Sequence, residues 1–305
     1  MLGKVRSCAI IGLQGVMVEV EVDISPGLPN FHMVGLPDAA VSEAAERVRS
    51  AIRNSGFQFP GTRIAVNLAP ADLKKESPAY DLPIALAILI ASKQLAVDLS
   101  DHMLLGELSF DGSLRHTSGI LPMVSFGVER GLYKAMVPEA DAKEAALVKG
   151  VTVLGVKSLF DLAAHLRGEV EISPTPQELI RFDQGMCPGL VDFTHIKGQE
   201  HAKRALEVAA AGGHNIVMTG PPGSGKTLMA RSLPGILPRL TQQEALEVTK
   251  IYSVGGALSA EMPMVTRRPF RSPHYTTSMA GAVETIFPEV DAASASAVLT
   301  AGVSS

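Results

Sequence analysis

The chain has 305 residues, of which 46% are hydrophobic and 19% are charged, and its formal net charge is −4. This length and apolar content suit about two domains with buried cores. The nearly balanced charge excludes a protein whose overall field draws it to nucleic acid or to an anionic membrane, although it leaves room for a local basic patch. The two cysteines, Cys8 and Cys187, have no further Cys or His at metal-ligand spacing, so a disulfide framework or a zinc knuckle is excluded and a reducing, cytoplasmic location is expected.

Two segments resemble membrane or export signals but have simpler interpretations. The most apolar run, Leu82 to Ala91, ends at Ser92 and is shorter than the roughly 20 residues needed to span a bilayer, so we expect a buried helix and no membrane association. Near the N-terminus, valines at every second position from Val16 to Val22 alternate with acidic residues. That period of two is typical of a half-buried strand, not of a signal peptide.

The first 170 residues predict one domain of mixed helices and strands. Helical spacing of apolar residues ends before Gly56, which is placed for a left-handed cap, and Asp111-Gly112 is a hairpin turn signal. We expect helices over residues 39–54, 82–93, 120–130, 140–149 and 158–167, and strands over 16–23, 62–68, 134–138 and 151–156, with strand, turn and strand over 102–115.

A change of composition then predicts a domain boundary. Residues 171–190 contain several prolines and glycines with few large apolar residues, which is typical of a linker. The next domain, 191–283, is expected to run from a helix over 200–211 through a short apolar strand over 215–219 to a glycine-rich string and a helix opening at Lys226.

The glycine-rich string GPPGSGKT has the composition of a loop that holds a polyphosphate. Glycines let the backbone curl so that successive N–H groups converge on phosphate oxygens, and the following helix turns its positive dipole end toward them. In this pattern the lysine reaches the β and γ phosphates and the threonine hydroxyl is a Mg²⁺ ligand. The sequence therefore predicts binding of ATP or ADP with Mg²⁺ by Gly220, Pro221, Pro222, Gly223, Ser224, Gly225, Lys226 and Thr227, with Thr227 as the metal ligand.

Two flanking segments carry weaker signals. A basic, proline-rich stretch from 266 to 278 contains Arg267, Arg268, Arg271 and His274. It is either a solvated loop or a surface that contacts DNA phosphates or a neighbouring subunit. The tetrapeptide IKGQ (196–199) is in isolation either a turn or part of a nucleotide site.

Six ordered strings together resemble one family. NFHMVGLPD, NLAPADLKKESPAYDLPIALAIL, GELSFDGSLRHTSGILPM, IKGQEHAKRALEVAAAGGHN, GPPGSGKT and RRPFRSPHYTTS resemble the bacterial magnesium-chelatase-like AAA+ proteins of the YifB/ComM competence family over residues 1 to 282. The resemblance implies an α/β protein, with an α+β N-terminal domain of the ribosomal S5 domain 2 or Lon-protease type over 1–170, followed by the first part of a P-loop AAA+ domain. It also implies that Ile196 and Gln199 lie beside the adenine ring, and that the whole protein is a hexameric, ATP-driven DNA branch-migration motor.

The likeness to Lon protease raises a second hypothesis, peptide hydrolysis by a Ser and Lys dyad. The resemblance places Ala79 at the nucleophile and Leu121 at the base, and neither side chain can do that chemistry. A third hypothesis, a subunit that inserts magnesium into tetrapyrroles, rests on the AAA+ part alone. We therefore expect the N-terminal domain to be a binding or assembly platform.

Hydrolysis needs more than a phosphate loop. P-loop ATPases also use acidic residues at the end of a second buried strand, the Walker B segment, and no such string follows Thr227. From Glu284 the residues depart from the family pattern, so we expect a C-terminally truncated chain with a disordered tail over 284–305. The sequence thus leaves open two classes, a working ATPase and a non-hydrolysing nucleotide-binding remnant, and assigns no catalytic residue.

Overall fold

The computed structural model describes residues 2–35, 43–71, 78–177, 191–258 and 262–270. The chain divides into two compact units. The first consists of Met1–Leu179 together with Thr249–Met264, and the second consists of Ile180–Val248 together with Val265–Ser305. The predicted linker lies largely, and the predicted tail wholly, outside the described residues. The return of 249–264 to the first unit has no counterpart in the sequence-based domain boundaries, which stay a prediction.

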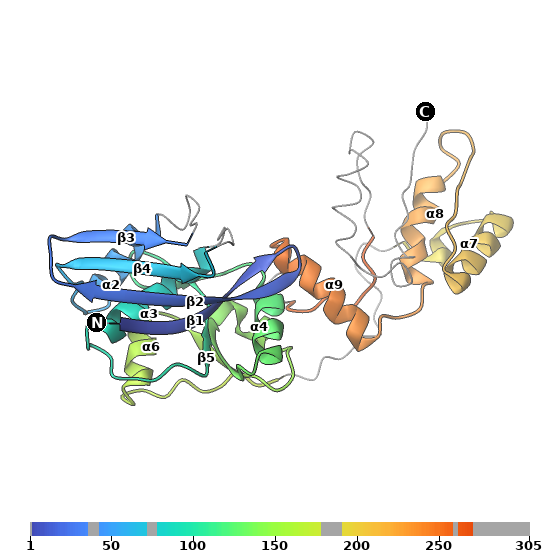
Figure 1. Ribbon diagram of the computed structural model, residues 1–305. Coiled ribbons are helices and arrows are strands. Elements are labelled where there is room, and N and C mark those ends of the chain that lie inside the picture. The colour runs from blue at the N-terminus through green and yellow to red at the C-terminus, as the bar shows by residue number, and fades with distance from the viewer. Residues whose placement is uncertain (1, 36–42, 72–77, 178–190, 259–261, 271–305) are drawn as a thin grey trace. The chain divides into compact units, whose positions relative to one another are not determined.

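The first unit is built on a seven-stranded sheet of order β3-β4-β2-β1-β5-β8-β9. Its strands are β1 (Leu2–Ile11), β2 (Gln14–Ser25), β3 (Asn30–Val34), β4 (Arg63–Ala69), β5 (His102–Leu104), β8 (Lys134–Pro138) and β9 (Thr152–Val156). Strand β2 is antiparallel to both β1 and β4, whereas the other neighbours are parallel. Figure 1 shows β3, β4, β2 and β1 side by side in this order. The result is an α/β fold with a mainly parallel sheet.

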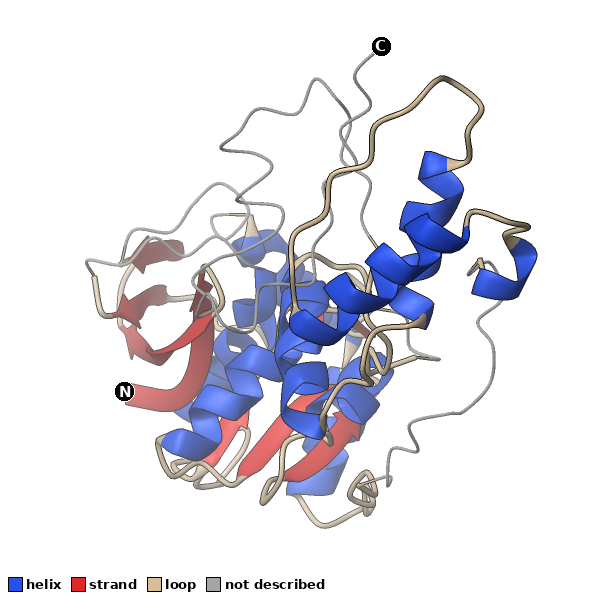
Figure 2. Ribbon diagram, turned by 90° about the vertical axis from the view of Figure 1, so that its right-hand side faces the viewer, coloured by secondary structure: helices blue, strands red, loops and turns tan. Residues whose placement is uncertain are grey.

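Helices cover both faces of this sheet, as Figure 2 shows. Alternate residues of a strand point to opposite faces, and in β1 Val5 and Ala9 join one apolar cluster whereas Cys8 joins the other. The first cluster includes residues of α2 (Ala44–Asn54), α3 (Asp81–Ala91) and α6 (Leu159–Leu166), and the second includes residues of α4 (Ile120–Glu129) and α5 (Ala142–Ala145). Helix α3 packs so closely that a Cβ on Gly3 of β1 would overlap the Ala87 carbonyl.

Most predicted elements of this unit are confirmed. The alternating valines lie in β2, Gly56 has a positive φ of 81° just after α2, and the Asp111-Gly112 turn joins β6 (Glu107–Leu108) to β7 (Leu114–Arg115). The helix predicted over 39–54 is described only from Ala44, because 36–42 lie outside the described residues. The helix predicted over 140–149 is shorter, since a 3₁₀ turn (Glu139–Asp141) precedes the four residues of α5.

The Cys8 thiol gives a direct test of the packing around β1. Its side chain is fully buried, and burial raises its pKa to about 12. Because only the thiolate is nucleophilic, we expect alkylation of Cys8 by N-ethylmaleimide at pH 8 to be at least about a hundredfold slower in the folded chain than in denaturant. Peptide mapping by mass spectrometry measures this rate residue by residue. Equal rates in the two conditions would show that Cys8 is not in a closed core.

The second unit contains five described helical segments beyond the boundary. They are the 3₁₀ turns Phe193–His195 and Leu233–Gly235 and the helices α7 (Glu200–Gly212), α8 (Lys226–Ser232) and α9 (Gln242–Val254), the last of which continues into residues of the first unit. Helices α7 and α8 confirm the predictions for 200–211 and for a start at Lys226. None of the helices in the described ranges is long and apolar enough to cross a membrane.

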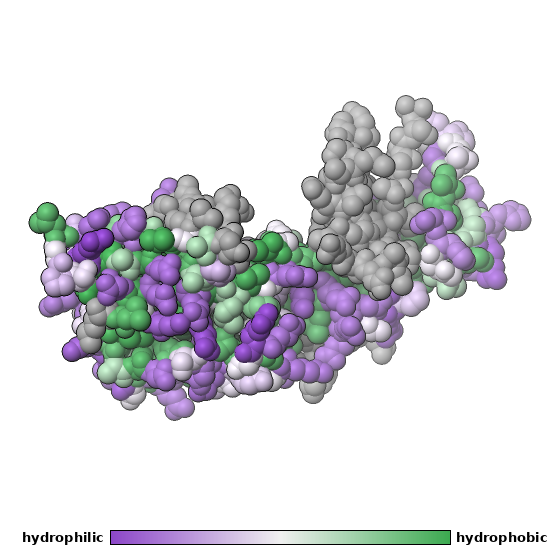
Figure 3. Space-filling model, viewed as in Figure 1, coloured by the Kyte–Doolittle hydropathy of each residue, from purple (hydrophilic) through white to green (hydrophobic). Residues whose placement is uncertain are grey.

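The strand predicted over 215–219 is wrong for the described structure. These residues form no ladder with another strand, and the Val217 side chain is 87% exposed while Ile216 and Met218 pack on the core of the unit. The short apolar run that predicted a strand does alternate between packed and exposed side chains, but a strand also requires a hydrogen-bonded neighbour. Apolar residues interrupt the polar surface of the segment that carries α7 and α8 in Figure 3, and exposed ones in this unit include Val208, Val217 and Leu228.

Candidate nucleotide site

The glycine-rich string forms a curled loop that ends at the start of α8. Gly223 and Gly225 have φ values of 80° and 85°, in the left-handed region that favours glycine, and Gly225 is the N-cap of α8. A Cβ at either position would meet no atom within 4 Å, so conformation and not space explains these glycines. The space beside these two glycines is thus open.

The Lys226 side chain lies in the curve of this loop. Its ammonium donates to the carbonyl oxygens of Gly220, at 2.7 Å, and Pro221, at 2.9 Å. The Ser224 hydroxyl is 3.4 Å away, and these residues are exposed or half-buried. The loop therefore holds the Lys226 ammonium with neutral carbonyl acceptors. Phosphate oxygens would be stronger acceptors, because their hydrogen bonds to the ammonium are charge-assisted. Thr227, the predicted metal ligand, is exposed directly beside it.

An apolar cluster packs between α7 and α8, the helix that follows the loop. Ile196, Leu206, Ala210, Met229 and Leu233 are its buried members, so α7 and α8 share one small core. Ile196 is only 6% exposed, and this burial makes packing under α8 its observed role. Gln199 is exposed and has a φ of 58° at the N-cap of α7. Contact of these two residues with an adenine ring stays a prediction.

The predicted basic segment is only partly described. Arg268 donates to the Pro238 carbonyl at 2.7 Å and to Glu244 Oε1 at 3.1 Å, and its side chain is 17% exposed. Arg268 is therefore engaged within its own unit. Arg267 is half-buried, and Arg271 and His274 lie outside the described residues. The predicted contact of this segment with DNA or a subunit stays untested.

The two residues at the positions of the Lon-like dyad are buried. Ala79 is fully buried, and its carbonyl accepts from Gly106 N–H at 3.0 Å. Leu121 is also fully buried, and its N–H donates to Glu144. Neither position therefore presents a side chain that could act on a peptide bond.

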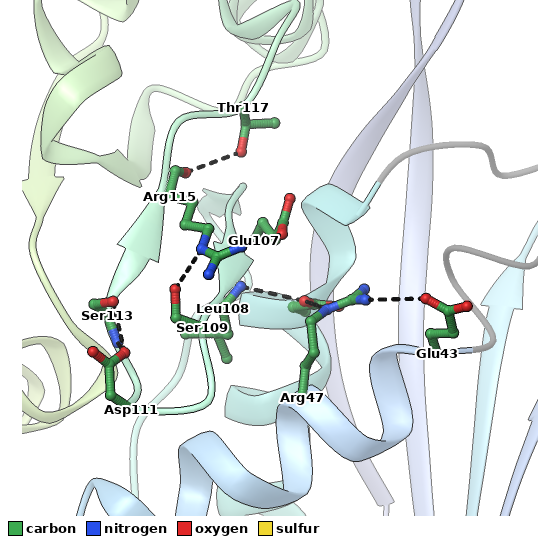
Figure 4. A network of polar contacts seen from close by, with 10 residues as sticks. Glu43, Arg47, Glu107, Leu108, Ser109, Asp111, Ser113, Arg115 and Thr117 are labelled. Carbon is green, nitrogen blue, oxygen red and sulfur yellow. Dashed lines mark hydrogen bonds and ion pairs between the residues drawn. The ribbon is translucent and has the colours of Figure 1, made fainter.

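A polar network occupies the neighbourhood of Ala79 instead, and sequence reasoning missed it. Figure 4 shows Arg47 of α2 directed toward Glu43, and the Arg47 guanidinium also forms an ion pair with the first residue of α3. That residue, Asp81, is completely buried, and its Oδ2 atom accepts from Arg47 Nε at 2.6 Å and from Leu108 N–H at 3.3 Å. An acidic residue at the start of an otherwise apolar helix was the available signal, because such a carboxylate requires a partner when buried.

Burial dominates the electrostatics of this pair. It raises the pKa of Asp81 to about 6 although the Arg47 guanidinium acts in the opposite direction. The pKa of Arg47 is raised by its hydrogen bond to Asp81, so the pair is held as an ion pair at neutral pH. Because the carboxylate is inaccessible, we interpret the pair as structural and not catalytic.

Comparison with known proteins gives consistent matches along the chain. Residues 20–141 match the family described as subunit ChlI of Mg-chelatase, and residues 192–293 match the family described as magnesium chelatase, subunit ChlI. The second match ends within the segment that follows Glu284.

Full-length relatives support the same assignment. The chain is 42% identical over 285 residues to YifB of Escherichia coli and 41% identical over 283 residues to the competence protein ComM of Haemophilus influenzae. These alignments cover 92% and 91% of this chain but 55% of each relative, so the chain spans about half their length. An archaeal Lon protease from Pyrococcus abyssi is 25% identical over 152 residues, which cover 48% of the chain and 15% of that protein.

Proposed function

We propose a nucleotide-binding function for this chain, which belongs to the magnesium-chelatase-like family of YifB and ComM. The ligand is ATP or ADP with Mg²⁺, and the site is the loop from Gly220 to Thr227. The observation that carries the proposal is the Lys226 ammonium, held inside a curled glycine loop by carbonyl oxygens at 2.7 and 2.9 Å.

The residues of the loop fit this ligand in three ways. The left-handed conformations of Gly223 and Gly225 let backbone N–H groups converge on anionic oxygens. Lys226 can exchange its carbonyl acceptors for phosphate oxygens without a change in the apolar cluster below, because its ammonium lies on the exposed side. The exposed Thr227 hydroxyl would complete the site as a ligand of Mg²⁺, which prefers oxygen donors and would neutralise part of the phosphate charge.

For the whole protein we propose the activity implied by its relatives. ComM is named a competence protein, and this name supports a role in handling DNA. The proposal is an ATP-driven, cytoplasmic DNA motor that works as a hexamer, in which the N-terminal unit is a platform for assembly or binding and Arg267, Arg271 and His274 are candidates for contacts with DNA or a neighbouring subunit. Nucleotide hydrolysis is part of that proposal and not of the narrower one for the loop.

Isothermal titration calorimetry of the purified chain tests the narrower proposal. We expect one molecule of ATP or ADP to bind per chain, and we expect EDTA to weaken the binding of ATP because the metal shields the phosphates. Absence of binding by a chain whose circular dichroism shows the folded state would contradict the proposal. Phosphate release and DNA band shifts in the same preparation test the wider one separately.

A further inference from the structure

The last part of helix α9 is built into the N-terminal unit. Residues Thr249–Met264 group with that unit although parts of the P-loop unit precede and follow them in the chain. Thr249 is fully buried, and Ser253 and Met264 are 2% and 7% exposed. The first residues of the same helix, from Gln242 to Val248, group with the P-loop unit. A single continuous helix thus contributes residues to both units.

One buried carboxylate accepts a hydrogen bond from the end of this helix. Glu144 of α5 is 5% exposed, and its Oε1 atom accepts from the Ser253 hydroxyl at 2.6 Å and from Leu121 N–H at 2.8 Å. Ser253 also accepts a hydrogen bond, because the N–H of Gly119, the N-cap of α4, donates to the Ser253 carbonyl at 3.0 Å. The start of α4 and the end of α9 are therefore tied to each other and to the same carboxylate.

Close packing surrounds these bonds. Gly119 has a φ of 81°, and a Cβ on it would overlap Ile10 of β1 and lie 3.9 Å from Val254 of α9. The φ value alone favours glycine at this position, and any other side chain would also have to displace the end of the Ile10 side chain. The backbone of the α4 N-cap is thus inserted between the sheet and the end of α9.

A second buried carboxylate lies near Glu144, so the charge of Glu144 depends more strongly on the hydrogen bond from the Ser253 hydroxyl. Asp141 is 2% exposed, and it accepts from Thr117 N–H at 2.9 Å and contacts the His116 ring. Burial raises the pKa of Glu144, and the nearby Asp141 charge adds to this effect, whereas the bonds from Ser253 and Leu121 lower it. A buried charge that loses one of two donors is left poorly compensated.

We propose that Glu144 is the anchor by which the N-terminal unit holds Thr249–Met264, a segment that follows the phosphate loop in the chain, through Ser253 and the start of α4. Helix α9 has 13 residues and is about 20 Å long at 1.5 Å per residue, and its residues from Thr249 onward are the ones that group with the anchored unit. This inference is independent of nucleotide binding.

Hydrogen exchange of the full chain, followed by mass spectrometry, tests the anchor with a Ser253→Ala variant. The variant removes one hydrogen bond to a buried charge, and we expect exchange of the amides at 250–257 and 119–124 to become at least about tenfold faster. Exchange in β1 and β2 should stay as in the wild type, which shows that the sheet is folded.

The matched control is Ser232→Ala. Ser232 is also a fully buried helical serine, but within the described residues its hydroxyl bonds the Met229 carbonyl of its own helix, at 2.7 Å, and no carboxylate. We expect this control to leave exchange at 250–257 within about twofold of the wild type. Two results would overturn the proposal. One is unprotected exchange at 250–257 in the wild type, and the other is a Ser253→Ala variant that differs from the wild type by no more than the control does.

Discussion

A Lys226→Ala variant is expected to bind MgATP at least about tenfold more weakly than the wild type, and up to about a hundredfold. A hydrogen bond to a charged group contributes about 1.5–3 kcal/mol, and each 1.36 kcal/mol corresponds to a factor of ten. The lysine ammonium carries a full charge directed at the triphosphate, so its loss affects ATP more than a ligand with fewer phosphates. Calorimetric affinities for ATP, ADP and AMP measure this gradient.

The Lys203→Ala variant is a suitable control for this loss. Lys203 lies on α7 of the same unit, where its ammonium is 3.2 Å from Glu200, and its replacement removes the same unit of positive charge. We expect this control to bind MgATP as the wild type does, within about twofold. If both variants bind alike, the affinity comes from the overall charge of the unit, and the loop assigned here is not the site.

The outcome of sequence reasoning differs between the two units for a physical reason. Local patterns predicted β2 and β4 because their apolar alternation reports a buried face within one short segment, whereas β8 was predicted as a short, continuous apolar run. Strand β1 was missed because residues Ser7, Cys8 and Ala9 are all buried, so its middle has no polar face to produce a period of two. The apolar run at 215–219 has no neighbouring strand within the described part of the chain, and a short segment contains no information about such a neighbour.

The candidate nucleotide site was predictable because its residues are contiguous. Eight neighbouring residues contain the glycines, the lysine and the threonine, and their conformation follows from the string itself. The structural carboxylates were not predictable in this way. Arg47 pairs with a residue 34 positions away, and Ser253 bonds Glu144 across 109 positions, so each pair exists only after the chain has folded.

The buried pair of Arg47 and Asp81 is expected to give the largest change in stability. An Arg47→Met variant keeps an unbranched apolar stem but leaves the Asp81 carboxylate, which is fully buried, with only the Leu108 N–H among the contacts described for it above. Removal of one partner of a buried ion pair costs about 3–5 kcal/mol, because the remaining charge stays desolvated. Guanidinium unfolding followed by circular dichroism, together with hydrogen exchange in α3, measures the loss in the N-terminal unit.

The double variant Arg47→Met/Asp81→Asn separates the lost charge pair from lost packing. Asparagine keeps an acceptor oxygen for Leu108 N–H but carries no charge, so most of the 3–5 kcal/mol should return, to within roughly 1–2 kcal/mol of the wild type. If the double variant is as unstable as Arg47→Met, the loss arises from the packing of the Arg47 stem between α2 and α3 and not from the carboxylate.

The pH dependence of the stability of Arg47→Met provides an independent test of the same interaction. In the wild type, burial already raises the pKa of Asp81 from 3.8 to about 6, and the loss of Arg47 removes the strongest opposing interaction. A carboxyl whose pKa is higher in the folded state than in the unfolded state destabilises the fold above its folded pKa, and this penalty vanishes as the pH falls toward the unfolded pKa. The stability difference between Arg47→Met and the wild type should therefore shrink between pH 8 and pH 5, because protonation neutralises the unpaired carboxyl. A difference that grows on acidification would mean that Asp81 stays charged through other donors, and that the guanidinium is not its main partner.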